Sequence, residues 1–210
     1  MITKHILKLT CGLLAIAGAL SARVSSAALY HVDVNTAPLI GNPAGPFSLD
    51  FQLNDGSGLG DGNNSVTIGN FVFGTGGPLG SATLLGGAAG DLASGVTLTD
   101  TTAFNEFFQS FTAGSTLSFD VSLTANADAG PTPDAFVFGI LDYSLGNIPT
   151  TGVGDSLLLI NISADALNVQ TGNSISPAGV VATVPEPSSF VFAGLGLTIA
   201  CWRARKVARH

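Results

Sequence analysis

The stretch PFSLDFQL, residues 46–53, alternates apolar and polar side chains along its whole length. In an extended chain, successive side chains point to opposite faces, so the apolar members share one face: Phe47, Leu49, Phe51 and Leu53. The stretch STLSFDVSL, residues 115–123, repeats this alternation. One buried and one solvated face are typical of antiparallel sheets, because parallel strands are usually buried on both faces. The sequence therefore predicts an all-β fold of antiparallel sheets.

Six further stretches have the same character and complete the predicted set of strands. Each is bounded by residues that favour turns, namely Gly, Pro, Asn or Asp: 29–34, 65–73, 95–100, 134–143, 155–163 and 178–184. This many short strands with regular turns predicts an antiparallel β-sandwich of the jelly-roll type over residues 28–183. Residues 75–90 are rich in Gly, Ala and Leu, and we expect a loop there, with at most a weak strand at its edge.

Four phenylalanines in one segment allow two structures: Phe104, Phe107, Phe108 and Phe111. Their spacing is that of one helix face, whereas the flanking threonines and the Ala113-Gly114 turn favour one arm of a hairpin. We favour the strand over a short helix. In either structure we expect these rings to lie in the core rather than in a binding site.

The charges of the chain are separated by region. All the lysines and arginines lie in the first 23 or the last 8 residues. Between residues 28 and 184 the chain has 13 carboxylates, and its only basic side chain is His31. Such a segment repels the phosphates of nucleic acids and lacks the basic patch that holds a protein on anionic lipid. We therefore expect no nucleic-acid partner.

The first 27 residues have the composition of a secretory signal peptide. Lys4 and Lys8 form a basic start, residues 9–20 form an apolar run, and Ser25-Ser26-Ala27 presents small residues to a signal peptidase. We expect cleavage after Ala27, with an uncleaved anchor as the alternative. Cys11 and Cys201, the only cysteines, lie in the two terminal segments, so the part between them has no thiol or disulfide.

The last 27 residues contain three parts in a fixed order. Val184-Pro185-Glu186-Pro187 comes first, an apolar stretch over residues 188–202 follows, and a basic tail ends the sequence. Counted from Val184 to Trp202, the apolar stretch comes close to the length that a transmembrane helix requires. Basic residues mark the cytoplasmic side of such a helix, so we expect the tail to stop transfer there: Arg203, Arg205, Lys206 and Arg209.

This tripartite end resembles the PEP-CTERM sorting signal of Gram-negative bacteria that make extracellular polysaccharide. The resemblance implies that Pro185, Glu186 and Pro187 are recognised by exosortase, a membrane-embedded cysteine protease-transpeptidase that removes the helix and the tail. It also implies a precursor anchored in the inner membrane, whose exported part then reaches the cell envelope or the extracellular space. A plain C-terminal anchor is the alternative.

The most polar stretch is LNDGSGLGDGNNS, residues 53–65. Oxygens of Asp55, Asp61, Asn63 and Asn64 could bind Ca²⁺, which prefers carboxylate and carbonyl ligands. The spacing matches neither an EF-hand loop nor a repeated Ca²⁺-binding array, and its Asp-Gly pairs are typical of turns. We favour a solvated loop without a cofactor and keep Ca²⁺ as the alternative.

Residue types that catalyse reactions are scarce between the terminal segments. A nucleophile needs a neighbouring base, and His31 is the sole histidine there, with no lysine to replace it. Two carboxylates suffice for glycoside hydrolysis, and Glu106 is the sole glutamate of this part of the chain. The sequence alone does not pair the candidates: Asp50, Glu106, Asp120, Asp134 and Asp142.

We therefore expect a non-catalytic secreted or surface-attached protein that is a structural or adhesive component of the extracellular polysaccharide matrix. Signal peptidase and exosortase are its expected processing partners, and extracellular polysaccharide is a candidate partner. One alternative is a Ca²⁺-assisted carbohydrate-binding module that uses residues 53–65 and Tyr143. The other is a two-carboxylate enzyme that acts on glycosides through Glu106.

Overall fold

The structure is a computed structural model that describes residues 28–126, 131–163, 167–172 and 180–183. The predicted signal peptide with its cleavage site at Ala27 and the predicted sorting signal at residues 184–210 lie outside these ranges. Within them, no helix is both long and apolar enough to cross a membrane. The predicted transmembrane stretch, residues 188–202, also lies outside the described residues.

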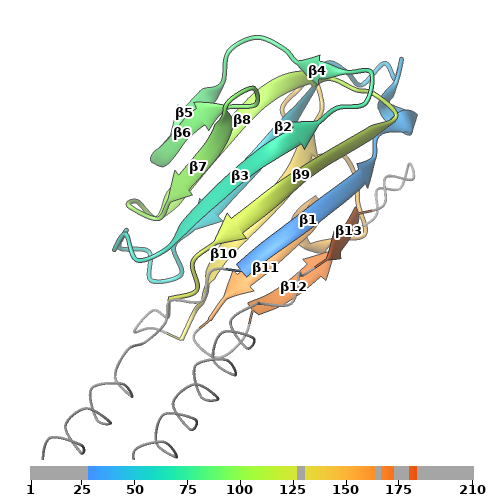
Figure 1. The fold of residues 1–210 in the computed structure, drawn as a ribbon. Coiled ribbons are helices and arrows are strands. Elements are labelled where there is room, and N and C mark those ends of the chain that lie inside the picture. The colour runs from blue at the N-terminus through green and yellow to red at the C-terminus, as the bar shows by residue number, and fades with distance from the viewer. Residues whose placement is uncertain (1–27, 127–130, 164–166, 173–179, 184–210) are drawn as a thin grey trace, which may run out of the picture.

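Two antiparallel sheets make up the described part of the chain, and they lie one behind the other in Figure 1. The first sheet, in front, has the order β13 (Val180–Thr183), β1 (Ala28–Asn35), β9 (Thr116–Leu123), β3 (Ser65–Val72), β7 (Gly95–Thr99) and β6 (Gly87–Asp91). The second has the order β12 (Leu167–Thr171), β11 (Leu158–Ile162), β10 (Asp134–Leu141), β2 (Phe47–Asn54), β8 (Phe104–Thr112) and β4 (Gly77–Pro78), and β5 (Thr83–Leu85) also pairs with β8. Two short 3₁₀ helices lie in connections, at Ala37–Leu39 and Val153–Asp155.

The predicted all-β architecture of antiparallel sheets is confirmed. Phe51 of β2 lies 5.1 Å from Phe138 of β10 and 5.4 Å from Phe119 of β9, measured between ring centroids. The first contact lies within the second sheet and the other joins the two sheets, so their inner faces pack into one core. Aromatic pairs of this kind contribute about 0.5–1.5 kcal/mol each beyond the burial of their area. The jelly-roll type stays a prediction.

The alternation of residues 46–53 produces the expected buried face on β2, where Phe47, Leu49, Phe51 and Leu53 are all buried. The opposite face of this strand differs from the expectation. Ser48 and Asp50 face away from the core, yet both are buried as well. This outer face of the second sheet is therefore partly covered around β2.

The predicted strand through the four phenylalanines is confirmed as β8. Its period of two places Phe107 and Phe111 in the core and turns Phe104 and Phe108 to the other face. The expectation that all four rings lie in the core is wrong for Phe104, which is 40 % exposed, and for Phe108, which is half-buried on the outer face and not part of the core. The helical spacing coincided with a strand because positions 107 and 111 satisfy both periods.

Residues 75–90 are the main correction to the predicted elements, because they contain β4, β5 and most of β6 instead of a loop. Two amide side chains of β8 hold this segment. Asn105 Oδ1 accepts a 2.8 Å hydrogen bond from the Gly87 N–H, and Gln109 donates to the Gly80 carbonyl at 2.8 Å. Gln109 Oε1 also accepts from the Leu92 N–H at 2.9 Å. The chain passes from the second sheet to the first at Gly86, whose φ of 60° favours glycine.

Candidate functional site

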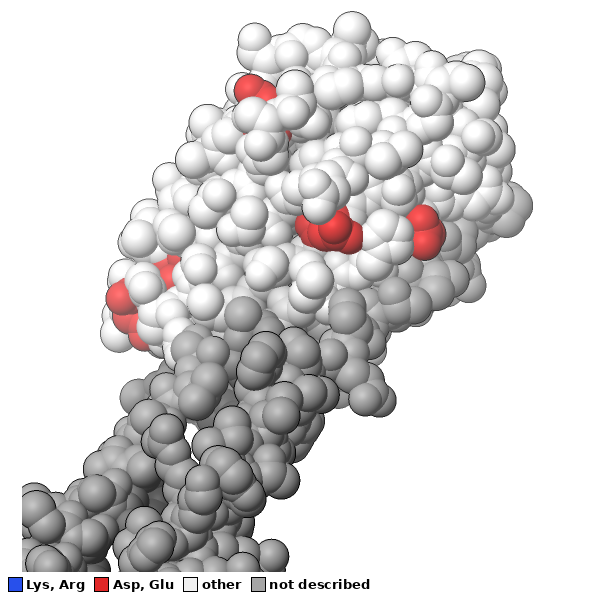
Figure 2. All heavy atoms as spheres, viewed as in Figure 1, with Lys and Arg blue, Asp and Glu red and all other residues white. Residues whose placement is uncertain are grey.

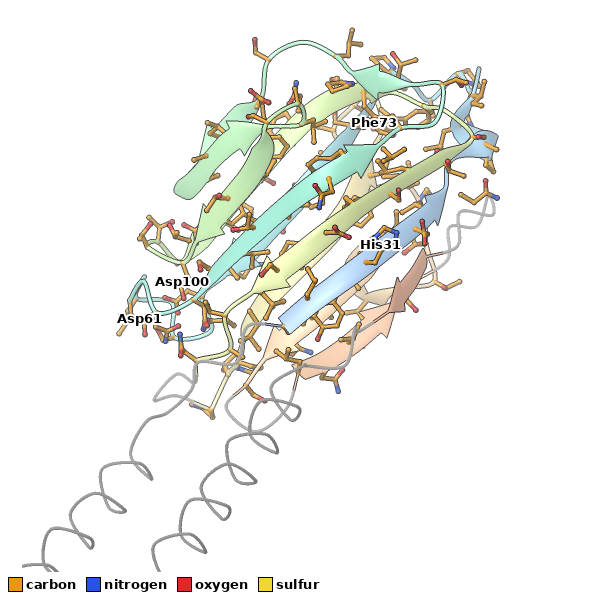
Figure 3. All side chains as sticks on the ribbon, viewed as in Figure 1. His31, Asp61, Phe73 and Asp100 are labelled. Atoms are coloured by element: carbon orange, nitrogen blue, oxygen red, sulfur yellow. The ribbon has the colours of Figure 1, made fainter. Side chains whose placement is uncertain are left out.

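Four buried polar side chains gather at one end of the two sheets. Asp55 follows β2, Asn64 precedes β3, Asp100 follows β7 and Asp134 begins β10. Figure 3 shows Asp61 and Asp100 together at this end, well away from His31. Adjacent strands of antiparallel sheets start and stop at the same edge, which explains why residues so distant in sequence meet here.

Asp55 holds the loop that connects β2 to β3. One of its carboxylate oxygens accepts hydrogen bonds from Ser57 Oγ at 2.6 Å and from the Gly58 N–H at 2.9 Å. The other accepts from the N–H groups of Gly60 at 2.6 Å and Asp61 at 3.1 Å. Burial opposes ionisation most strongly, but together these hydrogen bonds outweigh it, and the pKa of Asp55 lies below its ordinary value.

Asn64 connects this loop to both sheets. Its side-chain amide donates to Asp134 Oδ2 at 2.7 Å and accepts from the Asn126 N–H at 2.9 Å. Its backbone N–H donates to Asp100 Oδ2 at 2.9 Å. Burial raises the pKa of Asp100, although the hydrogen bonds with Asn64 and Asp134 act in the opposite direction.

The residues proposed as Ca²⁺ ligands occupy this end: Asp55, Asp61, Asn63 and Asn64. The carboxylate of Asp61 accepts from the Asn63 backbone at 3.1 Å and from its side chain at 3.0 Å, and the oxygens of Asp55 accept loop N–H groups. Among the described residues, no three His, Cys, Asp or Glu side chains are placed to hold a metal ion. The Ca²⁺ site stays a prediction.

Sequence reasoning missed Asp100 altogether, and it named Asp134 only as a candidate catalytic carboxylate, not as a member of this cluster with the loop. The signal that could have found them is their position, because each lies at the boundary of a predicted strand, 95–100 and 134–143. Only the pairing of the strands shows that both boundaries lie at the same end of the molecule.

A second group of carboxylates lies on the outer face of the second sheet, where the structure pairs Asp50 with Glu106. Gln52, which lies opposite Glu106 in the β2–β8 register, donates from Nε2 to Asp50 Oδ2 at 2.8 Å and to Glu106 Oε1 at 3.2 Å. Burial, and next the charge of Glu106, raise the pKa of Asp50 to about 7, while the Gln52 hydrogen bond acts against them. Burial also raises the pKa of Glu106.

This pair is poorly placed to act on a bound substrate. A catalytic acid or base must come within hydrogen-bonding distance of the reacting group, and Asp50 is only 4 % exposed. The other carboxylates that the sequence offered for glycoside chemistry do not lie near the Asp50–Glu106 pair. Asp120 is on β9 of the first sheet, Asp134 is at the end cluster, and Asp142 accepts hydrogen bonds from Ser144 and Gly146 in a turn.

His31 lies on the outer face of the first sheet, where each of its two ring nitrogens faces a carboxylate. Its Nδ1 is 2.6 Å from Asp120 Oδ1, and its Nε2 is 3.6 Å from Asp33 Oδ1. Asn70 donates to Asp120 Oδ2 at 2.7 Å from a β-bulge, where its φ is 54°. The hydrogen bond with Asp120 is the main cause that raises the pKa of His31. Figure 2 shows separate carboxylates on an otherwise uncharged face.

Tyr143 is exposed and lies at the end of the sheets opposite the 53–65 loop. Its N–H donates to the Ala44 carbonyl, just before β2, whereas the Gly56 N–H donates to Asp134 at the start of β10. The length of β10 separates the two places, which is about 25 Å at 3.4 Å per residue. The loop and Tyr143 therefore do not belong to one binding site.

The C-terminal prediction has independent support. A family model described as the PEP-CTERM protein-sorting motif matches residues 183–206. The chain carries a PEP-CTERM sorting motif. The matched range includes Pro185, Glu186 and Pro187 and the bases Arg203, Arg205 and Lys206, while Arg209 lies beyond it.

The motif implies export, a membrane-anchored precursor and processing by exosortase. The match covers the C-terminal segment and none of the two sheets except Thr183 of β13. No curated protein and no solved structure matches this PEP-CTERM chain.

Proposed function

We propose that this PEP-CTERM protein is a non-catalytic structural or adhesive component of the extracellular polysaccharide matrix. The sorting motif at residues 183–206 is the observation that carries the proposal. The sheets support it in two ways: the Asp50–Glu106 pair is closed to substrate at Asp50, and His31 contacts carboxylates rather than a nucleophile. The acidic residues keep such an exported domain soluble until it reaches the matrix.

The route of the chain is part of the same proposal. Signal peptidase removes residues 1–27 after Ala27, and the apolar stretch at residues 188–202 anchors the precursor in the inner membrane. The bases at Arg203, Arg205, Lys206 and Arg209 remain on the cytoplasmic side. Exosortase then releases the acidic domain to the cell envelope or the extracellular space.

Sorting is tested by changing the proline pair. The double variant Pro185→Ala, Pro187→Ala is expected to accumulate as an uncleaved precursor in the membrane fraction, detected by its mass. The control Pro149→Ala changes an exposed proline between β10 and β11 and is expected to be processed like the wild type. Normal processing of the double variant would contradict recognition of the motif.

The matrix role is tested by location and by activity. We expect the processed protein to copurify with extracellular polysaccharide, and we expect neither the wild type nor Glu106→Gln to hydrolyse it. Recovery of the processed protein only as a free species in the medium would contradict a matrix role. Glycoside hydrolysis that Glu106→Gln abolishes would establish the enzyme instead.

The second candidate is a Ca²⁺-assisted carbohydrate-binding module. The negative charge that Asp55, Asp61, Asp100 and Asp134 bring to one end of the sheets supports it, because the sequence between residues 24 and 202 has no lysine or arginine to offset that charge, although no three of these side chains are placed to hold a metal ion as they stand. In this case, EGTA lowers the melting temperature and abolishes retention on the polysaccharide, and added Ca²⁺ restores both. A melting temperature that does not respond to EGTA or Ca²⁺ would reject this candidate.

A further inference from the structure

Asp50 is a buried carboxyl group on the solvent side of a sheet, which is an unusual position for an acidic residue. In the register of the second sheet it lies opposite Phe108 of β8 and Gly139 of β10. The side chain of Asn147 leans over Gly139, so closely that an added Cβ there would lie 3.0 Å from Asn147 Oδ1. This part of the outer face is therefore covered by neighbouring residues rather than by bulk water.

The hydrogen-bond donors at this place are fewer than the acceptors. The Gln52 amide has two N–H groups, and Nε2 uses them for Asp50 Oδ2 and Glu106 Oε1. Asp50 Oδ1 is buried and has no hydrogen-bond partner among the described residues. A buried acceptor without a donor is costly, and a buried charge without a partner is more so.

The groups around Asp50 supply no positive charge. The outward positions of β10 are Ala135, Val137, Gly139 and Leu141, and β5 contributes only Thr83, Leu84 and Leu85. In the connection after β10, Asp142 accepts hydrogen bonds from Ser144 and Gly146, and Asp155 accepts a hydrogen bond from the Thr150 N–H. Glu106 is thus the titratable group that faces Asp50, and it has the same sign.

We propose that Asp50 and Glu106 share one proton near neutral pH and that this sharing makes the β-sheet domain more stable as its surroundings acidify. Protonation turns Asp50 from a buried charge into a neutral acid and removes its repulsion with Glu106. The pair titrates as a unit, because each charge affects the other. This inference does not depend on the matrix role.

The direction of the effect follows from proton linkage. The pKa of Asp50 is about 7 in the folded protein against 3.8 when the group is free. Between these values the folded state binds more protons than the unfolded state, so stability falls as pH rises. One proton changes the unfolding equilibrium constant by up to about tenfold per pH unit in this window. The stabilisation is complete below the lower value and is lost as pH rises through the upper one.

The experiment follows the Asp50 carboxyl carbon by NMR and the unfolding equilibrium by urea denaturation, using the full chain in a mild detergent between pH 4 and 8.5. We expect the Asp50 signal to titrate near neutral pH and the unfolding constant to rise by at least tenfold from pH 5 to pH 8. Asp50→Asn should remove most of that rise. Glu106→Gln should move the Asp50 midpoint to lower pH, because the charge of Glu106 is gone.

The matched control is Asp33→Asn, which removes an exposed carboxylate from the first sheet and should leave the Asp50 midpoint as in the wild type. Because Asp33 also helps to raise the pKa of His31, this variant should change the pH dependence of stability only by the small contribution of that exposed histidine. Titration of Asp50 near pH 4 would overturn the proposal, as would an unchanged pH dependence in Asp50→Asn. An Asp50 midpoint that stays the same in Glu106→Gln would show that Asp50 titrates alone and that no proton is shared. If Asp50→Asn does not fold, the wild-type titration still tests whether Asp50 binds a proton near neutral pH, and Glu106→Gln still tests whether the pair shares it.

Discussion

At the scale of single residues, amides take the place that bases have in most proteins. The residues that the structure describes include no lysine or arginine, and their buried carboxylates accept hydrogen bonds from backbone and amide N–H groups instead. Gly56 and Asn64 donate to Asp134, and Gln52 donates to Asp50. Several N–H donors lower the pKa of a carboxyl group, as at Asp55, whereas burial with few donors raises it, as at Asp50.

His31 gives a prediction at this scale. Asp120→Asn should lower the pKa of His31 towards 6.5, because the Asp120 hydrogen bond is the main cause of the increase. The protonated form contributes stability below pH 6.5 that is lost as pH rises through the folded pKa, and the contribution is small because the pair is exposed to solvent. Imidazole NMR between pH 5 and 9 measures the shift. The control Asp50→Asn, on the other sheet, should leave the His31 titration unchanged, and an unchanged titration in Asp120→Asn would refute the assignment.

At the scale of elements, β8 holds the segment from Gly80 to Leu92, which contains β5 and β6, against the two sheets. Its core-facing positions alternate between rings and amides, with Phe107 and Phe111 separated by Gln109. The rings pack in the core, while the amides of Asn105 and Gln109 bind the backbone of the segment that contains β5 and β6, at Gly87, Gly80 and Leu92. Because buried polar groups require partners, these amides and that backbone satisfy each other.

Gln109→Leu tests whether the Gln109 amide holds this segment, because the substitution keeps the bulk of the side chain and removes both of its hydrogen bonds. The Gly80 carbonyl and the Leu92 N–H lose their partner, and we expect a cost of about 1–3 kcal/mol in the free energy of unfolding. Urea denaturation measures it, and faster hydrogen exchange at Leu92 should accompany it.

The matched control is Gln170→Leu on β12, where the side chain is exposed and bonds only to Asn168 among the contacts described. An exposed substitution of this kind changes stability by about 0.5 kcal/mol or less. Equal losses in the two variants would mean that the Gln109 amide does not hold the segment.

At the scale of the whole molecule, apolar side chains determine the fold, and acidic side chains determine the net charge. Burial of the two inner faces drives folding, whereas the 13 carboxylates between residues 28 and 184 oppose it by mutual repulsion. A fold with a continuous apolar core tolerates this excess of charge. The unequal distribution of charge along the chain matters for its route, because the bases lie only in the terminal segments.

The repulsion is measurable through paired substitutions at one exposed site. Gln170→Lys should raise the melting temperature at low salt, and Gln170→Glu should lower it, since one reduces and the other increases the net negative charge. The difference should shrink as NaCl increases from about 10 mM to about 1 M, where the Debye length falls from roughly 30 Å to 3 Å. A difference that persists in 1 M NaCl would mean that local contacts, and not the overall charge, separate the two variants.

The elements that the sequence predicted well are those whose alternation is long and regular. Residues 46–53 and 115–123 became β2 and β9 because an extended chain can bury their rings only on one face. The segment at 75–90 has little alternation, since Gly and Ala offer no contrast between faces, and its strands depend on the amides of β8. Likewise β12 was not predicted, because no side chain of Leu167–Thr171 is fully buried.

The sequence alone determined that the sheets are antiparallel, that the central part of the chain is anionic, and that a sorting motif follows it. The alternation of neighbouring residues, the count of charged residues and a short contiguous motif are enough to establish these three features. The tertiary structure alone decided which distant residues meet: Asp50 with Glu106, and Asn64 with Asp100 and Asp134. Strand register sets these meetings, and register depends on the packing of both sheets at once. Burial, and with it the proton affinity of Asp50, follows from that packing, so no reading of residues in sequence order could have assigned it.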